Sequence, residues 1–145
     1  MSAGRSEGAR HMTASEPRSI VERFLELGAV GRIDDALELT SPDLVWTNIG
    51  STRFSGAFEG RERVVEGLLG PLFGSLEGGI DSTVEAVVAD GEHVVVFSSG
   101  RARTRDGRPY DNRYAQHFEV RDGLIAAVTE YMDTALIDAT FGPAD

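Results

Sequence analysis

The sequence predicts one α+β domain in which N-terminal helices precede an antiparallel sheet. Two patterns lead to this expectation: apolar residues recur at helical spacing in the first half of the chain, and they alternate with polar residues in the second half. A chain of 145 residues is enough for one domain with one core, and neither an internal repeat nor a linker divides it.

The first eleven residues are interpreted as an expression leader rather than as part of this domain. Residues 1–11 are polar, rich in glycine and aperiodic, and His11-Met12 resembles a cloning junction followed by a second start. We therefore expect residues 1–11 to be disordered and residues 12–145 to form the domain.

Three helices are expected ahead of the main sheet. Ser15-Glu16-Pro17 is typical of a helix start, and apolar residues continue the helix until Gly28. A second, short helix is predicted over residues 33–39. A third is predicted over residues 61–69, where valines and leucines form an apolar stripe.

The sheet is predicted from period-two alternation and from turn residues. Strands are expected over residues 44–48, 83–89, 92–103, 110–121 and 124–133. The dipeptides Asp90-Gly91 and Asp122-Gly123 are typical of hairpin turns, so the last four strands should form an antiparallel meander. Residues 50–60 are expected to form a loop, and residues 134–141 to add a helical turn.

The composition excludes several kinds of chemistry. The chain has no cysteine and no lysine, which rules out thiolate nucleophiles, sulfur-ligated metals and Schiff bases. No nucleotide-binding motif and no zinc motif is present, so we expect neither a cofactor nor a metal. A net charge of −10 argues against nucleic-acid and membrane partners, and the lack of a signal sequence predicts a cytoplasmic protein.

Alternation in the last strand identifies Glu130 as the most informative residue. Its predicted face also carries Leu124, Ala126, Val128 and Met132, so Glu130 is a lone carboxylate among apolar side chains. One interpretation is a general acid/base whose pKa is raised by an apolar site. The other is a structural glutamate paired with an arginine such as Arg101.

Six segments carry a resemblance to a known family. They are Ile20–Leu25, Asp43–Asn48, Phe58–Glu62, Tyr110–Tyr114, Phe118–Ile125 and Glu130–Asp133. Through them, residues 16–139 resemble the SnoaL-like polyketide cyclase group of the nuclear transport factor 2-like superfamily, which also contains ketosteroid isomerases and limonene epoxide hydrolase.

The resemblance implies a cone-shaped, curved antiparallel sheet with the N-terminal helices covering one face and enclosing an apolar pocket. It also implies a homodimer formed through the outer face of the sheet. In SnoaL-like cyclases and limonene epoxide hydrolase, an acidic residue lies seven places after the glycine of the last hairpin. That position is Glu130 here. Trp46 and Asn48 occupy the places of two residues that position water in the epoxide hydrolase.

On this template we expect a cofactor-independent acid/base enzyme that acts on a small hydrophobic carbonyl-bearing metabolite, as a polyketide cyclase or an isomerase does. Glu130 would move the proton, and Asn48, Asn112 and Gln116 would form hydrogen bonds to a carbonyl or enolate of the substrate. The expected substrate contacts are Trp46, Asn112, Tyr114, Gln116, Phe24, Phe97, Arg101 and Met132. The alternatives are a non-catalytic binding protein with the same fold, or an epoxide hydrolase-like enzyme with a modified relay.

Overall fold

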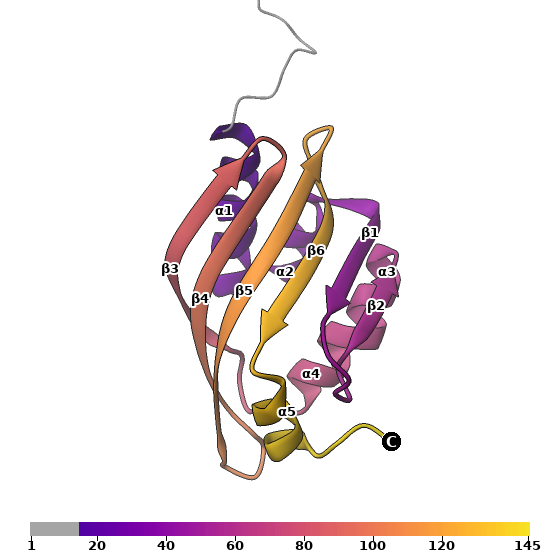
Figure 1. The fold of residues 1–145 in the computed structure, drawn as a ribbon, viewed down its shortest axis with the longest axis vertical. Coiled ribbons are helices and arrows are strands. Elements are labelled where there is room, and N and C mark those ends of the chain that lie inside the picture. The colour runs from indigo at the N-terminus through magenta and orange to yellow at the C-terminus, as the bar shows by residue number, and fades with distance from the viewer. Residues whose placement is uncertain (1–14) are drawn as a thin grey trace, which may run out of the picture.

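Helical spacing followed by strand alternation produces two layers, with helices packed on one face of a six-stranded sheet (Figure 1). The computed structural model describes residues 15–145, so the interpretation of residues 1–11 as a leader lies outside the described residues. The helical elements are α1 (Ser15–Ala29), α2 (Ile33–Leu37), α3 (Arg61–Val64), the π-helical turn η2 (Val65–Leu69), α4 (Gly70–Gly74) and α5 (Thr134–Phe141). The strands are β1 (Thr40–Asn48), β2 (Gly56–Glu59), β3 (Asp81–Asp90), β4 (His93–Arg103), β5 (Pro109–Arg121) and β6 (Leu124–Met132).

The sheet is curved, open and mixed, with the strand order β2-β1-β6-β5-β4-β3. The predicted meander of β3 to β6 is present, and each of its neighbouring pairs is antiparallel. The expectation of a wholly antiparallel sheet is corrected at β1, which runs parallel to β6. This pairing brings Asn48 opposite Glu130, although 82 positions separate them in the chain.

The segment predicted as a loop over residues 50–60 contains the short strand β2, which pairs antiparallel with β1. Four residues with glycine at one end give too little alternation for a strand to be recognised. The third helix is also longer than predicted: it continues past residue 69 as α4. Pro71 has no amide hydrogen and cannot continue an α-helical ladder, which accounts for the π turn η2 just ahead of it.

The hydrophobic core lies between the inner face of the sheet and the helices. Val21 of α1 and Leu68 of η2 are buried against sheet residues such as Phe118 and Val96. In β6, the predicted apolar set is corrected at its start: Ile125 is fully buried, whereas Leu124 and Ala126 are only partly buried. A bulge causes the shift, because Val120 pairs with Ile125 while Glu119 pairs with Ala127, leaving one extra residue in β6.

Candidate functional site

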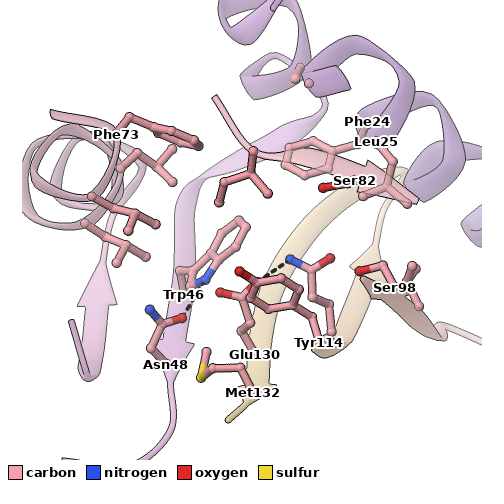
Figure 2. A pocket seen from close by; sticks show the side chains of 18 of the residues that line it. Phe24, Leu25, Trp46, Asn48, Phe73, Ser82, Ser98, Tyr114, Glu130 and Met132 are labelled. Carbon is pink, nitrogen blue, oxygen red and sulfur yellow. Dashed lines mark hydrogen bonds between the residues drawn. The ribbon is translucent and has the colours of Figure 1, made fainter. Parts of the chain in front are cut away.

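A cavity of about 260 Å³ lies between the helices and the inner face of the sheet (Figure 2). Its walls are mainly apolar and come from α1, α2, the α3–α4 helix and α5 as well as from the sheet. The polar side chains that reach it come from strands and are Asn48, Ser82, Ser98, Tyr110, Tyr114, Gln116 and Glu130. An apolar cavity with a few converging polar groups is the usual form of a small-molecule site.

Glu130 lies on β6 between two amide side chains of the neighbouring strands. Its register partners are Asn48 on β1 and Gln116 on β5. The Gln116 amide Nε2 donates a hydrogen bond of 2.6 Å to Oε2 of Glu130. Burial raises the pKa of the Glu130 carboxyl from 4.5 to about 7, while hydrogen bonds from Gln116 and Trp46 act in the opposite direction. A carboxyl with this pKa can both accept and release a proton near neutral pH.

Trp46 and Asn48 form a hydrogen-bonded pair beside Glu130. The Trp46 indole Nε1 donates to Oδ1 of Asn48 at 3.1 Å, and the Asn48 amide Nδ2 donates to the backbone carbonyl of Phe54 at 3.0 Å. Both ends of the Asn48 amide therefore have protein partners. This arrangement fixes the indole ring in the cavity wall and orients its N–H toward the polar end of the site (Figure 2).

Tyr114 contributes a hydroxyl to the cavity, and its ring packs closely on β4. Burial raises the pKa of the Tyr114 hydroxyl far above its ordinary value of 10, and the neighbouring Tyr110 adds to the effect. The hydroxyl therefore keeps its proton and can act as a neutral donor. A Cβ at Gly100 would lie 3.0 Å from the Tyr114 ring and 2.7 Å from Cγ2 of Ile80, so the ring requires glycine at this position.

Seven of the ten predicted site residues line the cavity. They are Glu130, Asn48, Trp46, Tyr114, Gln116, Phe24 and Met132. Figure 2 shows Glu130, Tyr114 and Met132 close together at one end of the cavity, with Phe24 across from them on α1.

The structure places the other three predicted residues elsewhere. Asn112 is buried but does not line the cavity; its amide Nδ2 donates to the Tyr110 hydroxyl and to the Asp133 carbonyl, and its Oδ1 accepts from the Asp133 amide. Asn112 therefore stabilises the packing of the end of β6 against β5 through these hydrogen bonds. Phe97 and Arg101 point to the opposite face of β4 from Val96, Ser98 and Gly100, and both are exposed to solvent.

The alternative interpretation of Glu130 as the partner of Arg101 is wrong, because these side chains lie on opposite faces of the sheet. Within residues 15–145, no arginine forms a salt bridge with Glu130. The glutamate is therefore held by neutral hydrogen-bond donors alone.

Sequence reasoning did not identify Ser82, Ser98 or Tyr110 as cavity residues, nor Phe73 of α4. Ser98 could have been found, since it shares its parity with the buried Val94 and Val96 in β4. The position of Phe73 had no comparable signal, because it depends on the π turn that precedes α4.

No metal centre and no membrane span is evident in the described part of the chain. Residues 15–145 contain no group of three or more histidine, aspartate or glutamate side chains placed to hold a metal ion. None of the described helices is both long and apolar enough to cross a membrane.

Comparison with known proteins identifies the family. The sequence profile described as a SnoaL-like domain matches residues 21–128. No curated protein sequence matches the chain significantly.

Solved structures share the fold at low sequence identity. An NTF2-like protein from Burkholderia thailandensis superposes with a TM-score of 0.78 at 19% identity, covering 91% of this chain and 100% of that one. A candidate isomerase from Bacillus subtilis gives 0.76 at 16% identity, covering 92% and 99%. A candidate SnoaL-like polyketide cyclase from Jannaschia sp. CCS1 gives 0.72 at 18% identity, covering 96% and 98%. With the profile matching most of its length, the chain belongs to the SnoaL-like domain family.

Proposed function

We propose that the cavity is the active site of a cofactor-independent acid/base enzyme that acts on a small hydrophobic molecule bearing a carbonyl group. The observation that carries this proposal is Glu130, a carboxyl with its pKa raised to about 7 in an apolar cavity. Catalytic carboxyls are commonly tuned in this way by burial. The names of the isomerase and cyclase with the same fold agree with proton-transfer chemistry.

In the proposed reaction, the Glu130 carboxylate removes a proton from the carbon next to the substrate carbonyl. The electron pair of that C–H bond moves into an enolate, and the protonated Glu130 then returns the proton to the product. The reaction is therefore balanced without an oxidant or a reductant, as an isomerisation or a cyclisation requires.

Neutral donors stabilise the enolate oxygen in this scheme. Tyr114 and Ser98 both line the cavity, and the raised pKa of Tyr114 keeps its hydroxyl protonated. Fixed donors of this kind contribute about 2.7–4 kcal/mol each to transition-state stabilisation in well-studied cases. We assign Asn48 the role of a positioning residue, because its amide is engaged by Trp46 and by the Phe54 carbonyl.

The test is turnover by wild type and by Glu130→Gln on a panel of aromatic polyketides, enones and epoxides, followed by mass spectrometry, with thermal stabilisation as the measure of binding. Loss of the Glu130 carboxyl should lower the turnover rate by roughly 10²–10⁴-fold while binding survives.

The wild-type turnover rate should rise with pH and level off above about 7, because the base must be ionised. Glu119→Gln, on the other side of the sheet, is the matched control and should keep full activity. Equal turnover by Glu130→Gln would contradict the proposal.

A second candidate is a non-catalytic protein that binds the same class of molecule. It is favoured by the engagement of the Asn48 amide and by the presence of one carboxylate only among the described cavity residues. Binding of equal strength to wild type and Glu130→Gln, without product from any compound, would support it. An epoxide hydrolase-like reaction would have to use Glu130 alone, because it is the one carboxylate among the described residues that line the cavity and Arg101 lies on the outer face of the sheet.

We also propose a homodimer formed through the outer face of the sheet. Phe97 and Tyr131 are 42% and 47% exposed, and they lie in one row across the strands, with Ala115 between them. An exposed row of this kind is typical of a surface that contacts another protein.

A further inference from the structure

The cavity opens through an apolar rim, which we define as Ile33 of α2, Phe73 of α4 and Val84 of β3. Each of these residues lines the cavity, yet they are 42%, 39% and 47% exposed to solvent. Large apolar side chains that are both exposed and continuous with a cavity commonly mark a ligand-binding groove. Figure 2 shows Phe73 pointing from its helix toward the cavity, on the side away from Ser98.

The cavity is long in the direction that crosses the strands. Met132, Tyr114, Ser98 and Val84 are successive register partners on β6, β5, β4 and β3, and all four line the cavity. Three strand spacings separate the first of these strands from the last, which corresponds to roughly 14 Å at about 4.8 Å per spacing. A ligand that reaches from Glu130 to the rim must therefore be elongated.

The carboxyl and amide groups of the cavity lie on β1, β6 and β5, whereas β4 and β3 contribute only the hydroxyls of Ser98 and Ser82. Glu130, Gln116 and Asn48 are neighbours in one register row, whereas the rim at the β3 side is apolar. No arginine or histidine occurs among the described residues that line the cavity, so an anionic group would have no cation to pair with there and would face the Glu130 carboxyl.

We propose that the site takes an elongated ligand without an anionic group, with its polar end at Glu130 and an apolar tail that crosses the strands to β3 and leaves over the apolar rim. This inference rests on the proposed function, since it assumes that the cavity is the substrate site. It adds the shape and charge of the substrate: one polar end, an apolar body longer than the enclosed cavity, and no anionic group.

The test uses 4-n-alkylphenols from 4-methylphenol to 4-nonylphenol as probes, with affinity measured by isothermal titration calorimetry at pH 7. Affinity should rise roughly fourfold per methylene, the fold-change that corresponds to ~0.8 kcal/mol for each buried CH2 group. The gain should continue into the longest chains. 4-n-Alkylbenzoates of equal length should bind at least tenfold more weakly because they are anionic.

Variants of the rim separate its role from that of the inner cavity. Phe73→Ser and Val84→Ser should remove the affinity gain for the longer chains and leave 4-methylphenol binding unchanged. Val88→Ser is the matched control, because Val88 is an exposed valine of the same strand that does not line the cavity. It should bind the whole series as wild type does.

Three results would overturn the inference: affinity that stops rising at short chains, rim variants that bind long chains as wild type does, or benzoates that bind as well as phenols. These results concern binding only. Turnover that is independent of Glu130 would instead overturn the proposed reaction while leaving the ligand shape intact. Failure of every phenol to bind would overturn both, since the cavity would then not be a small-molecule site.

Discussion

At the residue scale, Glu130 combines a functional advantage with a cost to stability. Its carboxyl is surrounded by apolar walls and held by neutral donors, and burial raises its pKa to about 7. A buried carboxylate without a cation disfavours the folded state whenever it is ionised. Such a residue is more easily explained by a role in the cavity than by a contribution to folding, since active sites often reduce stability.

This environment predicts how stability depends on pH. The carboxyl titrates at about 7 in the folded protein and near 4.5 in the unfolded chain, so the folded state binds more protons between these values. The free energy of unfolding should therefore fall as pH rises from about 4.5 to 7, by roughly 3 kcal/mol at 1.36 kcal/mol per pKa unit. Urea unfolding of wild type and Glu130→Gln at pH 5 and pH 8 measures this effect.

Because glutamine is never ionised, the variant should lack the decrease and should be more stable than wild type at pH 8. The hydrogen bond from Gln116 can be kept, since the amide oxygen at position 130 still accepts it. Parallel pH profiles for the two proteins would show that Glu130 is not desolvated in the folded state.

Alternation in β5 and β6 reports which side chains share a face, and it identified the polar centre of the cavity. Gln116 and Glu130 were found in this way, and they meet in the structure. Phe97 was misplaced because its strand carries apolar residues on both faces, so alternation alone could not choose the inner one. Packing determines which face of β4 points inward. The ring of Tyr114 packs against Gly100, which has no side chain, so Gly100 lies on the inner face and Phe97, three residues earlier, lies on the outer face.

At the element scale, the helices and the meander of β3 to β6 were predictable because their signals are local. Helical spacing and Asp-Gly turns involve residues that are close in the chain. The parallel pairing of β1 with β6 joins segments that are far apart in the chain, and no turn between the two strands predicts it. The short strand β2 was missed because four residues show too little alternation, and its pairing with β1 determines it. The π turn η2 was missed although Pro71, which follows it, is a local signal.

The close contact between β4 and β5 gives a prediction for Gly100→Ala. The new methyl group would lie 2.7 Å from Ile80 and 3.0 Å from the Tyr114 ring, so at least one of these side chains must move. The free energy of unfolding should fall by about 1–3 kcal/mol, the usual cost of overpacking, and ligand affinity should fall as Tyr114 is displaced. Chemical denaturation and calorimetry measure the two effects.

Gly79→Ala is the control for this substitution, because a Cβ at Gly79 meets no atom within 4 Å. Its stability should stay within about 0.5 kcal/mol of wild type. If Gly100→Ala were equally harmless, the Tyr114 ring would not be held in place by the backbone of β4.

At the scale of the whole molecule, the two faces of the sheet have different surroundings. The inner face is covered by helices and forms the core and the cavity, as Figure 1 shows for α1 and α2. The outer face has no helix over its centre, and it exposes Val88, Phe97 and Tyr131. Local alternation indicates which side chains of a strand share a face, but it does not encode whether a second chain covers that face.

The proposed homodimer predicts that a charge in the outer row prevents association. Phe97→Asp places a carboxylate between Ala86 and Ala115 on the outer face, and a buried unpaired charge disfavours an interface strongly. Wild type should have twice the mass of one chain by size-exclusion chromatography with light scattering, and Phe97→Asp should have the mass of one.

Val30→Asp is the control, because Val30 is 71% exposed but follows α1 rather than lying on the sheet, and this variant should remain dimeric. A dimeric Phe97→Asp would place the interface elsewhere. A monomeric wild type at tens of micromolar would mean that the outer face is left open to solvent, which its exposed phenylalanine and tyrosine make unfavourable.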